Sequence, residues 1–213
     1  MRFSIRNFLL SSAILIAPAL QAQPISFGAK AGVPILDFFE TTKGNEASYF
    51  TNTKRYLIGG TVEFHLPWRF SIEVDGLYRR LGYQYEQSIP NNTFTTKTVA
   101  NSWEFPALVK WEIIPGPIRP FVDTGASFRN ISGIQQIRNI AGTDTNISTA
   151  TEFNKRNDIG FVAGFGIAFK AGPVRLSPEF RYTRWGSENF RDPIRSLLRT
   201  NRNQGDFMLG LTF

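Results

Sequence analysis

Hydrophobic and polar residues alternate along most of the chain from Ile25 onward. An apolar side chain at every second position, with polar or small side chains between, is typical of a β-strand with one apolar face. Eight segments show this alternation: residues 25–33, 56–66, 70–78, 99–113, 118–130, 158–170, 174–182 and 204–213. The pattern predicts an all-β fold, and the segment at 118–130 is its weakest member.

The connections between these segments alternate in length. Tight turns are expected where proline and glycine gather, at Pro67-Trp68-Arg69, Pro115-Gly116-Pro117 and Gly172-Pro173. The other connections are long and polar, at about 34–54, 87–98, 132–156 and 186–202. Short turns at one end and long loops at the other predict an eight-stranded antiparallel up-and-down β-barrel.

Alternation alone does not say which face of the barrel points inward. A soluble, lipocalin-like barrel has the same period, but its apolar residues line a cavity. Here the polar face carries Gly160, Gly164 and Gly166, which leave room for long side chains in a crowded interior. Trp103 and Trp111 share the apolar face of one strand, roughly 20 Å apart in height, close to the ~25 Å between the aromatic girdles of membrane barrels. Several segments also exceed ten residues, the length that crosses a bilayer at a tilt. We therefore predict a transmembrane β-barrel.

The first residues have the three parts of a secretory signal peptide. Arg2 and Arg6 precede an apolar run that ends near Leu20, and small residues follow. Cleavage after Ala22 is favoured over cleavage after Ala19. A membrane anchor is the alternative, but the run is short for a bilayer span. The expected division is a signal peptide at 1–22 and an outer-membrane β-barrel at 23–213.

The last segment, QGDFMLGLTF, has one apolar face. In a membrane barrel this face meets lipid, and the strand closes the barrel against the first strand. The pattern also resembles the signal that the bacterial outer-membrane assembly machinery reads, carried by Phe207, Leu209, Leu211 and Phe213. Both termini are expected on the periplasmic side.

Charged residues on the inner face need partners, because an eight-stranded barrel is just wide enough to be filled by side chains. If the turn at Gly116-Pro117 is a symmetric hairpin, Lys110 lies opposite Asp123, and Glu104 lies opposite Arg129.

A salt-bridged lumen follows from these pairs. Pro106 cannot donate to the ladder, so a β-bulge is expected there, and it would shift the second pair. The charges either fill the barrel, which we favour, or line a polar pathway. The other charges expected in this lumen network are Glu73, Glu179 and Arg181.

The connection at 186–202 contains a candidate basic helix. Asp192 and Pro193 form a typical helix start, and an apolar face follows. The helix either contacts lipopolysaccharide phosphates or folds as a solvated helix on the barrel rim, which we favour. Its basic face would carry Arg195, Arg199 and Arg202.

Composition narrows the function classes. The chain has no cysteine, which excludes disulfides and thiolate metal sites. Its net charge of +7 suits a phosphate-rich partner, and in an exported barrel we expect anionic lipid and no nucleic acid. The single histidine, His65, is expected near a short turn, away from the outer rim where a lipid hydrolase would hold its base. We therefore predict no enzyme activity, no cofactor and no metal.

The segment WEFPALVKW resembles the E-I-P-L-L-L-K strand of a bacterial outer-membrane β-barrel domain family that includes PorT-like and OmpX-like small barrels. PFVDTGASF, DIGFVAGFGIAF and LSPEFRYTRW resemble later strands of that family. The resemblance covers most of the chain after residue 24. It implies a small outer-membrane barrel and brings no catalytic residues with it.

We therefore expect an outer-membrane protein with a structural or surface-binding role. Its long loops would face outward and carry its specificity. The expected partners are outer-membrane lipid, lipopolysaccharide, the assembly machinery and an unidentified protein. The alternatives are a narrow channel for small solutes and an accessory barrel in secretion or adhesion.

Overall fold

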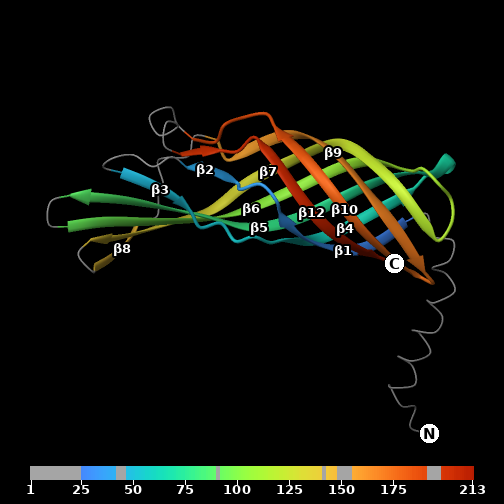
Figure 1. Ribbon diagram of the computed structural model, residues 1–213, viewed down its shortest axis with the longest axis horizontal. Coiled ribbons are helices and arrows are strands. Elements are labelled where there is room, and N and C mark those ends of the chain that lie inside the picture. Colours follow the sequence, from blue (N-terminus) through green and yellow to red (C-terminus); the bar gives the residue numbers. More distant parts are fainter. Residues whose placement is uncertain (1–24, 42–46, 90–91, 141–142, 148–154, 191–197) are drawn as a thin grey trace, which may run out of the picture.

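The computed structural model describes residues 25–41, 47–89, 92–140, 143–147, 155–190 and 198–213. Within them a closed antiparallel barrel is formed by β1 (Ile25–Pro34), β4 (Leu57–His65), β5 (Phe70–Ile89), β6 (Asn92–Glu112), β7 (Ile118–Ile140), β9 (Asn157–Ala171), β10 (Val174–Trp185) and β12 (Asn203–Thr212). β1 pairs with both β4 and β12, and β5 pairs with β6, which closes the ring (Figure 1). The predicted fold class is confirmed. Four short strands lie outside the ring: β2 (Phe39–Thr41), β3 (Ala47–Thr51), β8 (Thr143–Ile147) and β11 (Leu198–Thr200).

The faces of the strands are arranged as a membrane barrel requires. Large apolar side chains lie on the outer surface, where Phe161 and Phe165 are 59% and 61% exposed. Charged side chains lie inside, where Glu73 and Arg181 are 1% and 2% exposed. Water around this surface would meet a continuous apolar band, so the arrangement is stable only in hydrocarbon. No helix in the described residues is long and apolar enough to cross a membrane.

On β6 the apolar band has a tryptophan near each of its two ends. Trp111 stacks on Phe70 at the short-turn end, with ring centroids 6.3 Å apart. Trp103 packs against Tyr78 toward the other end, with centroids 5.1 Å apart. Beyond Tyr78 the next outward position on β5 is Arg80, so the lipid-facing surface ends there.

Strands continue where two long loops were expected. Residues 87–89 belong to β5 and residues 92–98 belong to β6, and the two strands pair as far as Ile89 and Asn92. Residues 132–140 belong to β7, whose far end pairs with β8. The loop predictions are wrong here because the segment TFTTKTV favours strand through its β-branched residues while both faces stay polar. Figure 1 shows these strands projecting well past the barrel.

Pro106 does not produce the expected bulge. It lies opposite Ser127, and β6 and β7 keep one register from Asn101 to Glu112. The ladder to β5 is interrupted opposite Pro106, yet it resumes in the same register at Leu77, which pairs with Glu104. The strand therefore tolerates the missing donor without inserting a residue.

The bulge in this strand pair lies farther along, in β7. The register shifts between the pairs Asn101–Ser132 and Val99–Gln135, so β7 contains one residue more than β6. Gly133 lies in this shift with a φ of +58°, which a residue with a Cβ rarely adopts. The additional residue changes which side chains of β7 point inward beyond this point.

The three tight turns are present as predicted. A 3₁₀ turn covers Pro67–Arg69 before β5. Gly116 and Gly172 have φ of +136° and +65°, as their hairpin turns require.

The predicted basic helix is wrong for its described part. Leu198–Thr200 forms β11 instead, which pairs with β2, and the Leu198 side chain is fully buried. Arg199 lies in this strand, and Arg195 lies outside the described residues. The guanidinium of Arg202 donates to the carbonyls of Trp185 and Gly186 at 3.1 and 2.7 Å, so it joins two strands.

Candidate functional site

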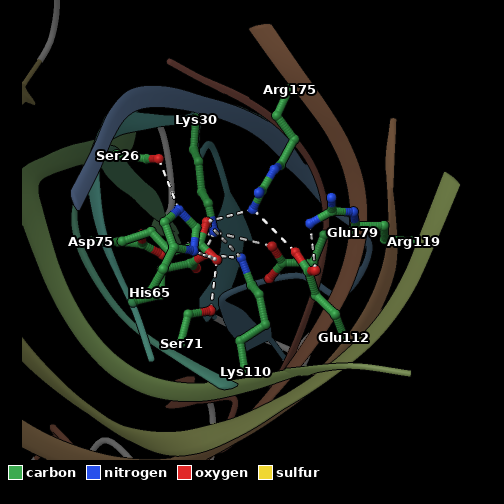
Figure 2. Close-up of polar contacts among 12 residues, drawn as sticks. Ser26, Lys30, His65, Ser71, Asp75, Lys110, Glu112, Arg119, Arg175 and Glu179 are labelled. Carbon is green, nitrogen blue, oxygen red and sulfur yellow. Dashed lines mark hydrogen bonds and ion pairs between the residues drawn. The ribbon is translucent and has the colours of Figure 1, made fainter. Parts of the chain in front are cut away.

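The centre of the lumen toward the short turns is filled by charged side chains (Figure 2). Glu73, from β5, contacts three cations: Lys30 of β1, Lys110 of β6 and Arg181 of β10. Glu73 Oε1 lies 3.0 Å from Arg181 Nη2. All four side chains are at most 6% exposed. One carboxylate thus holds together strands from different sides of the ring.

Two further carboxylates neutralise the same cations. Arg181 donates to Asp75 at 2.8 Å and to Glu179 at 2.7 Å. Lys30 lies 3.0 Å from Glu179. We call Lys30, Glu73, Asp75, Lys110, Glu179 and Arg181 the central charge cluster. Each of its cations lies within ion-pair distance of at least one of its carboxylates, so the buried charges largely offset one another.

A second group of ion pairs lies at the short-turn mouth. Arg175 reaches Glu63 at 3.4 Å and Glu112 at 3.2 Å, and Arg119 pairs with Glu112 at 2.8 Å. A cavity of about 270 Å³ opens beside these residues and His65. It is a shallow polar mouth above the central charge cluster.

A third group of charges lies toward the long-strand end. Arg79 pairs with Glu104 at 3.1 Å and lies 3.6 Å from Asp206. Arg129 pairs with Asp158 at 3.4 Å, and its guanidinium carbon lies 3.9 Å from the ring centroid of Trp185. This guanidinium is fully buried, so the stacked aromatic ring supplies the contact that water would otherwise give.

An apolar layer covers these charges at the long-strand end. Phe39 of β2 packs against Tyr83 and Phe190, with ring centroids 5.3 and 5.8 Å apart. The strand pair β2–β11 brings these side chains over the lumen. We call the whole buried set the apolar cap: Phe38, Phe39, Tyr49, Leu81, Tyr83, Ala100, Ile131, Phe190 and Leu198.

The sequence predicted the register of the lumen charges and not their ion pairs. Lys110 lies opposite Asp123, and Glu104 lies opposite Arg129, as the hairpin geometry requires. Within the described residues, however, Lys110 forms its ion pairs with glutamates of β4 and β5. Neither carboxylate oxygen of Asp123 has a hydrogen-bond partner there. Long side chains reach across a narrow lumen, so the nearest charge often belongs to a strand that is not adjacent.

Several lumen charges were not among the predicted site residues. Lys30 and Asp75 occupy polar positions of the alternating segments 25–33 and 70–78, and that position was the available signal. Arg79 lies one residue beyond the segment that alternation defined, and Asp158 and Asp206 lie near strand starts. Only closure of the ring shows which of these side chains meet.

One serine–histidine contact occurs at the short-turn mouth, which sequence reasoning missed. Ser26 Oγ lies 2.9 Å from His65 Nε2, and the two residues come from β1 and β4 (Figure 2). Glu63 lies 3.8 Å from His65 Nδ1, too far for a hydrogen bond. Its carboxylate instead accepts from Ser71 at 2.6 Å and pairs with Arg175. The histidine therefore lacks the orienting carboxylate that a hydrolytic triad needs.

No group of three His, Asp or Glu side chains in the described part of the chain is arranged to hold a metal ion. Apart from the Ser26–His65 contact, the described lumen side chains form ion pairs and pack against one another.

Comparison with solved structures finds small outer-membrane barrels. Neisserial surface protein A has 16% identity and a TM-score of 0.47, covering 89% of this chain and 96% of its own. OprG from Pseudomonas aeruginosa has 11% identity and a TM-score of 0.49, covering 89% and 94%. Ail of Yersinia pestis, solved with the heparin analogue sucrose octasulfate, has 11% identity and a TM-score of 0.42, covering 89% and 98%. Comparison with curated protein sequences finds no significant match.

A family profile matches a much longer part of the sequence than any short motif does. The profile of the outer membrane protein beta-barrel domain covers residues 21–186, which is more than half of the chain. Seven of the eight barrel strands lie in this range and have the outward apolar face that such a domain requires, and β12, beyond residue 186, closes the ring between β1 and β10. This chain belongs to the outer membrane protein beta-barrel domain family.

Proposed function

We propose that the protein is a non-conducting surface barrel of the outer membrane, with both termini in the periplasm and a binding surface outside the cell. The observation that supports this is a closed lumen beneath a sheet that continues beyond the apolar band. A closed lumen offers no path for a solute. A projecting sheet has no structural task in the membrane, so binding outside is the function it fits.

Two barriers in series close the lumen. The central charge cluster fills it toward the short turns, and each of its cations contacts at least one carboxylate. The apolar cap covers the opposite end with buried aromatic and aliphatic side chains. An ion that entered would have to separate buried ion pairs and then cross an apolar layer, and both steps are costly.

The orientation is tested with single cysteines, because the chain has none of its own. Ile137 lies on the projecting part of β7 and Ala171 lies at the short-turn end of β9, so the two variants are Ile137→Cys and Ala171→Cys. Both positions are exposed. A membrane-impermeant maleimide should label Ile137→Cys in intact cells and Ala171→Cys only after the outer membrane is permeabilised. The reverse labelling would overturn the proposed orientation.

The closed lumen is tested on the same purified protein in planar bilayers. We expect no large, stable currents, because neither barrier leaves a continuous water path. Steady open-channel conductance would instead support the alternative function, a narrow channel for small solutes. This second measurement does not depend on which end of the barrel faces outward.

A further inference from the structure

A groove lies in the projecting part of the sheet. The lipid-facing surface on β5 ends at Arg80. Tyr85 lies five residues farther along this strand, a distance of about 16 Å. A cavity of about 450 Å³ opens beside it, between the inward faces of β3, β5, β6 and β7. This sheet groove is therefore outside the apolar band, and it is separate from the lumen charges.

The bulge in β7 determines which side chains line the sheet groove. Without the additional residue at Gly133, the inward positions of β7 would continue to Gln135 and Ile137. With it, Gln136 and Arg138 face inward, opposite Thr98 and Thr96 of β6. One glycine with positive φ thus replaces an apolar inward side chain with a cation.

Aromatic rings form one wall of the groove. Tyr49 of β3 and Tyr85 of β5 have ring centroids 4.8 Å apart, and Phe94 of β6 lies on the same inward face. The Tyr85 hydroxyl donates to Gln87 at 3.1 Å, which holds the ring in place. Each ring stands on a hydrogen-bonded strand, so a ligand would meet a wall that is already ordered.

The opposite wall supplies polar groups and a single charge. The Gln136 amide donates to Thr98 at 3.2 Å, while the exposed Arg138 guanidinium faces the groove. No acidic residue is among the described residues that line it. Glu86, the nearest carboxylate along β5, is on the opposite face of the sheet, where Gln84 donates to it. The described lining of the groove therefore has a net positive charge.

These groups match the chemistry of an acidic sugar. A pyranose ring has an apolar C–H face that packs on aromatic rings and hydroxyls that bond to amides and threonines. An arginine with no carboxylate among the described lining residues suits a carboxylate or sulfate, which it binds in a bidentate manner. The strands that form the floor use their backbone groups in the ladder, so an added peptide strand would find no free donors on this face. We propose that the sheet groove binds an oligosaccharide that carries a carboxylate or sulfate group.

The proposal rests on the proposed exterior position of this sheet, and its test is independent of that position. The protein is placed in zwitterionic nanodiscs, which leave both ends of the barrel open to solution. Binding of oligogalacturonate, sulfated dextran oligomers and neutral dextran of equal length is measured by titration calorimetry. The two acidic oligomers should bind at least about tenfold more tightly than neutral dextran, since the described lining carries one cation and no carboxylate.

Variants locate the binding within the groove. Arg138→Gln should weaken binding of both acidic oligomers about tenfold, because it removes the guanidinium charge and leaves a shorter, neutral polar side chain. Lys97→Gln is the matched control: it removes the same charge from the opposite face of the neighbouring strand, opposite Ile137, and should change affinity less than about twofold. Tyr85→Leu should weaken both acidic oligomers about tenfold by removing an aromatic wall. Heat-modified gel mobility confirms that each variant is a folded barrel.

The outcomes separate the two proposals. Three results would overturn the groove proposal, whatever the cysteine labelling shows. They are an equal loss of affinity in Arg138→Gln and Lys97→Gln, an affinity for neutral dextran equal to that for the acidic oligomers, and no binding of either acidic oligomer. Nanodiscs that contain lipopolysaccharide identify the source of the ligand. If lipopolysaccharide in the nanodisc reduces binding of the soluble oligomers, the natural ligand is the cell's own acidic saccharide. If binding of the oligomers is unchanged, the natural ligand is a saccharide from outside the cell.

Discussion

Glu73 is the residue on which the interior depends most. It is 1% exposed and contacts Lys30, Lys110 and Arg181. Glu73→Gln keeps its shape but leaves three buried cations with one fewer carboxylate, and removing one partner from a buried ion pair costs about 3–5 kcal/mol. We expect that loss in urea unfolding from lipid vesicles. Glu86→Gln, on the projecting part of the same strand, should change stability by less than about 0.5 kcal/mol. Equal effects of the two substitutions would show that the central charge cluster contributes little.

Individual lumen residues were predictable only as far as one strand pair. Alternation placed Lys110 and Arg181 inward, and the short turn fixed the partners across β6 and β7. The contacts of Glu73 depend on β1 and β10, which are far apart in sequence and meet only after the ring closes. No local pattern contains that information, because the diameter of the barrel decides how far a side chain reaches.

Glycines on the inward face of β9 make space for large neighbours. A Cβ on Gly166 would lie 2.5 Å from the Phe121 ring and 2.5 Å from the Pro178 carbonyl oxygen. Gly166→Ala should therefore destabilise the barrel by about 1–3 kcal/mol in vesicle unfolding. Gly60 on β4 faces lipid, and a Cβ there would lie 3.8 Å from the Gly28 carbonyl oxygen, so Gly60→Ala should be neutral or slightly stabilising. A neutral Gly166→Ala would mean that this part of the lumen has spare room.

Elements were predicted best where one face is apolar. Within the membrane, the alternation in β9 and β12 identified both strands and their lipid-facing sides. Beyond the membrane, the segment at 92–98 has no apolar face, so its threonines were interpreted as a loop although they extend β6. The bulge was expected at Pro106 because proline lacks a donor, but Gly133, with its positive φ, is where β7 gains a residue.

For the whole molecule, the outward apolar band is the feature that specifies a membrane location. Its side chains come from all eight barrel strands, while the interior holds charges that an aqueous protein would place on its surface. Different interactions therefore stabilise the two faces of the barrel wall. Lipid accommodates the apolar face, and the ion pairs and the apolar cap fill the inside.

This division predicts a dependence on depth in the bilayer. Phe165 lies near the middle of the outward run on β9, and Phe169 lies near its short-turn end, and both are exposed to lipid. An arginine at the bilayer midplane costs about 2–4 kcal/mol, but near an interface it costs about 0–1 kcal/mol, because its side chain reaches the head groups. Phe165→Arg should therefore destabilise the barrel by several times more than Phe169→Arg, measured by urea unfolding from vesicles. The two variants make the same chemical change on the same face of one strand, so only depth distinguishes them. Equal costs would show that this band does not span a hydrocarbon layer.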